Sequence, residues 1–151
     1  MSTNDAMSLL IDLASRATDS RMRDLAGALA RERAEAERLR LLTDYRATYH
    51  QRLERAQREG INRALLQGYR QFIERLDGAI VQQTLMIEHR AADTTRARDD
   101  LSEAERRRKS LETVQARRAR TQRLLIERRE QKQHDEFATR ASAAGAGFND
   151  D

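Results

Sequence analysis

The sequence predicts an all-α protein, a long antiparallel two-helix coiled-coil hairpin whose second helix is longer and overhangs the N-terminus. The first observation is composition: 36% of the 151 residues are charged, 4% are aromatic, and proline and tryptophan are absent. Such a chain is typical of long helices rather than of a compact core. The second is that apolar residues recur three and four positions apart along most of the chain, as on one face of a helix. The third is that this pattern has one clear break, near Gly60.

The first helix is predicted over about 4–57, where only Gly27 is a poor helix former. Its apolar positions are Leu10, Leu13, Ala17, Leu25, Leu29, Ala36, Leu39, Leu42, Tyr45, Tyr49, Leu53 and Ala56. Two successive steps of three, at Ala36, Leu39 and Leu42, predict that the register slips there.

A turn is predicted over about 58–62, because Gly60 offers the left-handed position that follows a helix end. The second helix is predicted over about 63–140. Steps of three and four restart there, at Leu66, Tyr69, Ile73, Leu76, Ile80, Gln83, Ile87, Arg90, Thr94, Ala97, Leu101, Ala104, Arg108 and Leu111. Residues 1–140 then form a single hairpin domain, and the small, glycine-rich residues 141–151 a flexible tail.

Two helices joined by a short turn run antiparallel. With a turn centred near Gly60, facing residue numbers add up to about 121. This sum pairs apolar with apolar residues: Tyr49 with Phe72, Tyr45 with Leu76, Leu42 with Ala79, and Leu10 with Leu111. The second helix then extends about twenty residues past its partner, from about Arg120.

The stretch from Tyr69 to Ile80 is more apolar than one neighbouring helix requires. At 100° per residue its apolar side chains cover an arc of about 140°, wider than an ordinary amphipathic stripe. Some of Phe72, Leu76 and Ala79, with residues from the first helix, are therefore expected to stay partly exposed and to bind a partner. Two other interpretations remain open: bulky packing beside the bend, and self-association into a four-helix bundle.

The sequence predicts no enzyme, no cofactor and no metal site. Cysteine is absent, which excludes disulfides and thiolate chemistry. His134 shares a helix face with Glu130, but zinc sites need three or four ligands, so a solvated surface is expected. His50 and His89 have no convergent catalytic partners, and no phosphate-binding loop is present.

Charge separates the remaining classes of partner. The formal net charge is only +4, yet the second helix becomes basic at Arg106–Lys109, Arg117–Arg120 and Arg128–Arg129. This run can bind an acidic protein surface, bind nucleic acid non-specifically, or be a solvated face; no base-reading motif is present. The apolar N-terminal cluster around Leu10 is interrupted by Asp12 and lacks a basic leader, so a cytoplasmic protein is expected.

Four segments together resemble the FliJ family of the bacterial flagellar type III export apparatus. They are LRLLTDYRATYHQRL, the turn REGIN, YRQFIERLDGAIVQQ and the closing REQKQHDEFATR. The likeness runs from about Ala6 to Arg140, and the closing segment is its most specific part.

The resemblance implies a stalk and general chaperone with two partner-binding ends. The end that bears both termini binds the hexameric export ATPase FliI. Because basic side chains and one aromatic anchor suit such a contact, we expect it to involve Arg128, Arg129, Lys132, Asp135, Glu136 and Phe137. The other, near the bend, binds the export gate protein FlhA, through Leu42, Tyr45, Tyr49, Phe72, Leu76, Ala79 and Gln83. The resemblance also implies help in export chaperone cycling, peripheral attachment to the cytoplasmic face of the inner membrane through the gate, and no small-molecule substrate.

Three alternatives stay open beside this interpretation. The equivalent stalk of a virulence type III secretion injectisome shares the hairpin, although the aromatic segment and the DEFA motif favour the flagellar form. A basic coiled-coil protein that binds nucleic acid is the second alternative. A purely structural, self-assembling coiled coil is the third.

Overall fold

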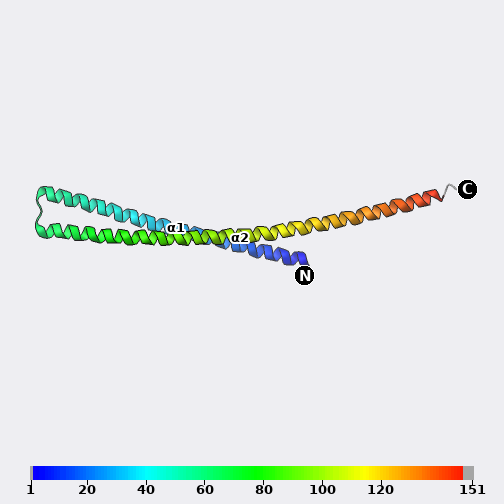
Figure 1. Ribbon diagram of the computed structural model, residues 1–151, viewed down its shortest axis with the longest axis horizontal. Helices are drawn as coiled ribbons and strands as arrows, with labels where there is room; N and C mark the ends of the chain where they lie inside the picture. The colour runs from blue at the N-terminus through cyan, green and yellow to red at the C-terminus, as the bar shows by residue number, and fades with distance from the viewer. Residues whose placement is uncertain (1, 148–151) are drawn as a thin grey trace. The chain divides into compact units, whose positions relative to one another are not determined.

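The computed structural model describes residues 2–147 as two long helices that pack against each other, which confirms the all-α hairpin (Figure 1). Helix α1 spans Thr3–Glu59 and helix α2 spans Arg63–Ala146, and the described part of the chain contains no strand. Contacts group the residues into two units. One is Ser15–Glu105, and the other combines Met1–Ala14 with Arg106–Asp151.

Helix α1 begins with a reciprocal cap that its first residues encode. The Asp5 backbone N–H donates to Ser2 Oγ at 3.3 Å, and the Ser2 N–H donates to Asp5 Oδ2 at 3.4 Å. Such a pair satisfies amide groups that have no partner within the helix. The helix therefore starts at Thr3, one residue before its predicted start.

The turn is shorter than predicted, because Arg58 and Glu59 still belong to α1. Gly60 has φ of 90°, the left-handed conformation that glycine adopts without steric cost and that commonly ends a helix. Asn62 then caps α2: the Leu65 N–H donates to its Oδ1 at 2.7 Å. Two local signals, glycine and asparagine, thus reverse the chain within residues 60–62.

Helix α2 continues to Ala146, six residues past its predicted end at about 140. Residues 141–146 include four alanines, and alanine has the highest helix propensity, which outweighs the single Gly145. The predicted flexible tail therefore begins with helix. Its last residues, 148–151, lie outside the described residues.

In the unit Ser15–Glu105 the predicted positions of α2 form its buried face. Each predicted position from Leu66 to Ala104 is buried or half-buried, and Ile73, Leu76 and Thr94 are buried most deeply. We call this contact between the two helices the seam. Its steps of three and four follow the seven-residue repeat of coiled coils.

The predicted register slip in α1 is wrong. The buried or half-buried positions keep the seven-residue repeat without interruption, at Leu25, Ala28, Glu32, Glu35, Leu39, Leu42, Arg46, Tyr49, Leu53 and Ala56. Glu35 and Arg46 occupy seam positions, whereas Ala36 and Tyr45 are exposed. The apolar pattern looked broken because charged residues stand at two positions of a continuous repeat.

The antiparallel register agrees with the prediction for the aromatic pair. Tyr49 and Phe72 have ring centroids 4.3 Å apart. The predicted pair of Tyr45 with Leu76 is not formed in the same way, because Tyr45 is 58% exposed whereas Leu76 is buried. At this level the neighbouring residue Arg46 joins the helices through an ion pair with Asp77.

The second unit, Met1–Ala14 with Arg106–Asp151, buries few of its described residues. Met7 and Ala14 are buried and Leu111 is half-buried. Ile11, rather than the predicted Leu10, is the half-buried residue of α1 at this level, and Leu10 is exposed. Every residue from Glu112 to the end of α2 at Ala146, and Gly147 after it, is exposed.

Candidate partner-binding surfaces

An aromatic cluster lies beside the seam near the turn. The Phe72 ring contacts the Tyr49 ring at a tilt of 46°, and the Tyr49 ring also lies 6.5 Å from that of Tyr69 at a tilt of 57°. The Arg52 guanidinium lies 5.1 Å from the centre of the Tyr49 ring, which is within the range of a cation–π contact. These contacts hold the aromatic side chains in place at one side of the hairpin.

Residues seven positions apart lie in one row along a coiled-coil helix. The rows next to the seam form its two sides, which we call its flanks, and their residues can be read from the sequence. On one flank, α2 places Leu65, Phe72, Ala79 and Met86 in such a row. The facing row of α1 is Arg38, Tyr45 and Arg52. We define the aromatic flank as this surface with its seam neighbours: Leu42, Tyr45, Tyr49, Leu65, Phe72, Ala79 and Met86.

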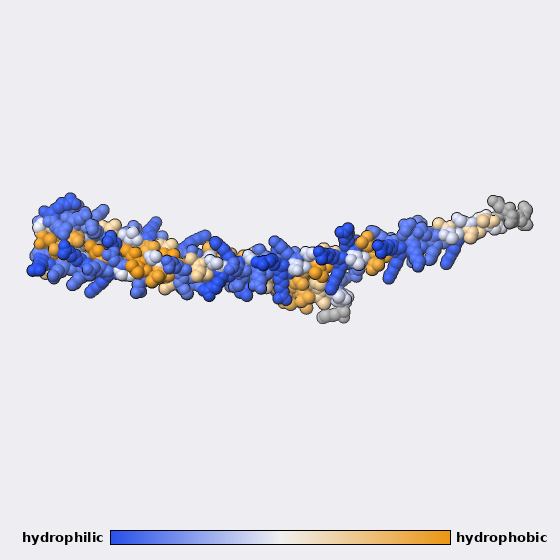
Figure 2. Space-filling view, in the orientation of Figure 1, coloured by the Kyte–Doolittle hydropathy of each residue, from blue (hydrophilic) through white to orange (hydrophobic). Residues whose placement is uncertain are grey.

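Large apolar side chains on the aromatic flank are exposed. The exposed fraction is 58% for Tyr45, 53% for Leu65, 41% for Met86 and 38% for Phe72. Figure 2 shows apolar residues gathered near the turn among hydrophilic ones. Apolar surface of this kind, fixed in place and open to water, is typical of binding sites for other macromolecules.

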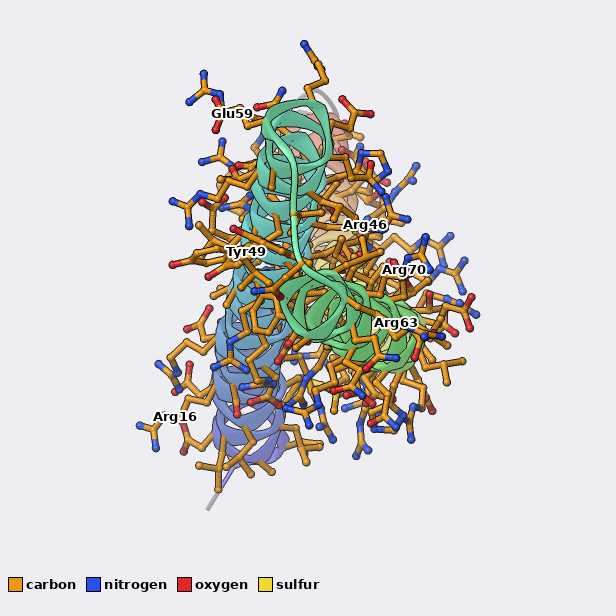
Figure 3. The ribbon with its side chains drawn as sticks, turned by 90° about the vertical axis from the view of Figure 1, so that its left-hand side faces the viewer. Arg16, Arg46, Tyr49, Glu59, Arg63 and Arg70 are labelled. Atoms are coloured by element: carbon orange, nitrogen blue, oxygen red, sulfur yellow. The ribbon has the colours of Figure 1, made fainter. Side chains whose placement is uncertain are left out.

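The opposite flank at the same level is polar. Its rows carry Thr43 and His50 in α1 and Arg70, Asp77 and Thr84 in α2. The Arg46–Asp77 ion pair joins the two helices there, and His50 Nδ1 lies 3.3 Å from Glu54 Oε1. Figure 3 shows Tyr49 on one side of the helix pair and Arg46 and Arg70 on the other. The exposed aromatic side chains near the turn, Tyr45 and Phe72, therefore lie on one flank.

The seven residues predicted to bind the export gate fall into three groups. Tyr45 and Phe72 are exposed, and Leu42, Tyr49, Ala79 and Gln83 are half-buried. Leu76 is only 8% exposed and is a packing residue of the seam, which corrects its predicted place among the partly exposed residues. The sequence prediction missed Leu65 and Met86, although their spacing of seven from Phe72 and Ala79 carries the signal.

Gln83 belongs to a block of polar seam layers that the apolar pattern did not reveal. Its Nε2 donates to Glu35 Oε2 at 2.6 Å and to the Glu35 carbonyl oxygen at 2.9 Å. Thr94 Oγ1 donates to Glu32 Oε2 at 2.8 Å, and Arg90 Nε lies 4.0 Å from Glu35 Oε1. Glu35 is buried, so these contacts replace the water that a carboxylate would otherwise bind.

The six residues predicted to bind the export ATPase all lie in the exposed part of α2. They are Arg128, Arg129, Lys132, Asp135, Glu136 and Phe137, and the exposed fraction of Phe137 is 72%. Gln131 Nε2 donates to Asp135 Oδ1 at 3.2 Å along the same helix. Between 106 and 132 the chain carries eleven Arg or Lys residues and three Glu residues, so this surface is strongly basic.

Within residues 2–147, no group of three or more His, Asp or Glu residues is placed to hold a metal ion. Over the same residues, no helix combines the length and the apolar character needed to cross a membrane. The geometry of the described chain offers helix surfaces, and the chemistry that they support is the binding of other macromolecules.

Comparison with known proteins gives consistent matches along the whole hairpin. A family model described as flagellar FliJ protein matches residues 3–147. The chain is 32% identical over 143 residues to a flagellar FliJ protein of Salmonella typhi, covering 94% of this chain and 97% of that protein. A flagellar FliJ protein of Escherichia coli (strain K12) is 31% identical over the same coverage. Because the matches span both helices and the turn, this chain belongs to the flagellar FliJ protein family.

Proposed function

We propose that this protein is a component of the flagellar type III export apparatus. It is a coiled-coil stalk that binds the hexameric export ATPase FliI, couples it to the export gate protein FlhA and assists the cycling of export chaperones. The observation that carries this proposal is the family match from residue 3 to residue 147, which includes both surfaces described above. A partial match would have left one of the two ends unsupported.

The proposed ATPase-binding end is the exposed part of α2. From Glu112 to Gly147 no side chain is buried, so each of them can contribute to contact with a partner. Arg128, Arg129 and Lys132 supply positive charge, Asp135 and Glu136 supply acceptors, and Phe137 supplies an aromatic anchor. Aromatic and arginine residues are those that most often dominate binding energy at interfaces.

The proposed gate-binding end is the aromatic flank. Tyr45 and Phe72 are its exposed aromatic residues, and the half-buried Leu42, Tyr49 and Ala79 connect them. The Tyr49 ring packs against the Phe72 ring, so a partner meets a preformed surface and less entropy is lost on binding.

In this proposal the chain itself hydrolyses nothing and needs no cofactor; it acts on the cycle of another protein. Its place is the cytoplasm at the flagellar base, peripheral to the inner membrane through the gate. The proposed partners include no small-molecule substrate and no specific nucleic acid.

The alternatives can be separated by simple measurements. The matched relatives are flagellar proteins, which favours this role over the stalk of an injectisome. The basic stretch from Arg106 to Lys132 keeps non-specific nucleic-acid binding as a second candidate. Such binding falls steeply with salt concentration, and it would leave the turnover of the export ATPase unchanged.

The decisive experiment measures ATP turnover of the purified export ATPase with and without this protein. The full chain should raise turnover, and a chain truncated before Glu127 should leave it at the unstimulated rate. The described residues that the truncation removes, 127–147, are all exposed, so helix packing elsewhere is expected to persist, and circular dichroism checks this.

A shorter truncation, which removes only residues 141–151, is the matched control and should keep most of the stimulation. If the chain truncated before Glu127 stimulated as well as the full chain, the assignment of this end would be refuted.

A further inference from the structure

The aromatic flank ends at the turn on one side and at charged residues on the side away from the turn, which gives it a defined length. Continuing its row in α2, Met86 is followed by Asp93 and Asp100, and in α1 Arg38 is preceded by Arg31 and Asp24. The apolar part therefore spans 65–86 in α2, about 33 Å at 1.5 Å per residue. This length matches an α-helix of about twenty residues lying along the seam.

The border of the aromatic flank carries one sign of charge. Two rows of residues spaced seven apart form this flank, and on each helix the next such row outward, at 34, 41, 48 and 55 in α1 and at 68, 75, 82 and 89 in α2, borders it. Over residues 34–55 and 65–89, these rows hold four arginines: Arg38, Arg52, Arg55 and Arg75. No carboxylate stands in these rows. The carboxylates of the same region lie elsewhere on their helices; Asp77 is paired with Arg46 on the opposite flank, and Glu54 with His50 and Arg58.

Three of these arginines, Arg52, Arg55 and Arg75, are available to a partner, whereas Arg38 forms an ion pair with Glu35 at 3.5 Å. Arg52 lies over the Tyr49 ring rather than beside a carboxylate, and among the described residues neither Arg52 nor Arg75 has an ion-pair partner. Coiled-coil helices usually carry charges of both signs at the positions beside the seam, and these pair across it. Here one flank follows that rule, whereas the other is apolar with only cations around it.

We propose that the aromatic flank binds an acidic amphipathic helix of a partner protein, which packs along the seam as a third helix. Its apolar stripe covers Tyr45, Phe72 and Met86, with the small Ala79 between the two large residues of α2. Its carboxylates face Arg52 and Arg75 at the two borders. This inference rests on the proposed function, because it specifies the chemistry of the segment that the export gate presents to this flank.

A second copy of this chain does not fit the same surface. In a symmetric dimer each flank would meet an identical flank, so Arg52 and Arg75 would approach the arginines of the other copy. Like charges brought together at an interface cost several kcal/mol in general. An acidic helix removes that repulsion and provides apolar side chains every three or four residues.

The test is a binding measurement with the purified soluble region of the export gate protein. The double variant Arg52→Glu/Arg75→Glu should bind at least about tenfold more weakly than the wild type, because it places carboxylates opposite carboxylates. Arg63→Glu/Arg70→Glu is the matched control: it makes the same change in charge on the opposite flank and should bind within about twofold of the wild type.

Hydrogen exchange of the gate protein in the complex identifies the bound segment. We expect slow exchange over a stretch of about twenty residues with apolar residues three and four apart and carboxylates on both sides. A protected stretch that is extended, or that lacks carboxylates, would overturn the inference.

Phe72→Asp separates this inference from the proposed function. If Phe72→Asp abolishes gate binding while both double arginine variants bind like the wild type, the gate site stands and the acidic helix is wrong. If the wild type does not bind the gate at all, the proposed function fails at this end, and the inference falls with it. A dimer of this chain that Phe72→Asp dissociates would identify a second copy as the occupant and also overturn it.

Discussion

Near the turn, the two helices bury large apolar side chains against each other, whereas from Glu112 to Ala146 helix α2 buries none. Leu53, Ile73 and Leu76 are almost inaccessible to water in the first region. In the second region every side chain is exposed. The same secondary structure is thus stabilised by different interactions in the two regions.

In the buried region, helix formation follows from tertiary packing. Each helix covers the apolar face of the other, and this burial supplies most of the free energy that keeps the helices folded. A residue there tolerates little change, because the seam has no spare volume.

In the exposed region, helix formation follows from local propensity. Residues 112–144 contain no glycine or proline, and Ala, Arg, Gln, Glu and Leu, all good helix formers, predominate. Thr121 and Thr139 donate to the carbonyl oxygens of Arg117 and Asp135 within the helix. Because no side chain here is buried, the residue types on this surface can be those that bind a partner.

The largest difference in the free energy of unfolding is expected between a buried and an exposed leucine. Leu76→Ala should lower the free energy of unfolding by about 2–5 kcal/mol, because it leaves a cavity in the seam. Leu41→Ala makes the same chemical change at a side chain that is 48% exposed, and it should change stability by less than about 1 kcal/mol. Urea denaturation followed by circular dichroism measures both. Equal losses would contradict the difference between seam and surface.

A smaller effect is expected at the polar layers of the seam. Glu35→Ala should cost about 1–3 kcal/mol of unfolding free energy, since it removes the carboxylate that accepts from the Gln83 amide and lies beside Arg90. Among the described residues, the Gln83 amide then keeps only the backbone carbonyl of residue 35, and Arg90 keeps only Asp93. The control is Glu37→Ala, which removes an exposed carboxylate 3.0 Å from Arg40; exposed ion pairs contribute little. A Glu35→Ala variant as stable as the wild type in urea denaturation would show that the polar layers do not stabilise the hairpin.

Much of the fold was predictable from the sequence because both helices keep the apolar repeat. The positions from Leu66 to Leu111 are all buried or half-buried, as predicted, and the Tyr49–Phe72 contact follows from the place of Gly60 alone. The α1 register was predicted wrongly between Ala36 and Tyr45. There the charged residues Glu35 and Arg46 occupy seam positions and bind Gln83 and Asp77 of the other helix. A pattern of apolar residues does not reveal such positions.

The candidate surfaces were predictable in part. The width of the apolar arc correctly indicated exposed apolar surface at Phe72 and Tyr45. The width of the arc could not show that Leu76 is buried whereas these residues are exposed. Which residues of the arc face the other helix depends on the register of both helices. The bond from Gln83 to Glu35 required the three-dimensional structure, since the two residues are 48 positions apart.

The smallest effect on stability is expected at Phe137. Its side chain is 72% exposed, so Phe137→Ala should change the free energy of unfolding by less than about 0.5 kcal/mol. The matched change Phe72→Ala removes the ring that packs against Tyr49 and should cost about 1 kcal/mol. If the proposed function is correct, Phe137→Ala should still weaken the stimulation of the export ATPase, because the aromatic ring serves binding and not packing. A Phe137→Ala protein with a lowered melting temperature and unchanged stimulation would reverse the roles assigned to the two phenylalanines.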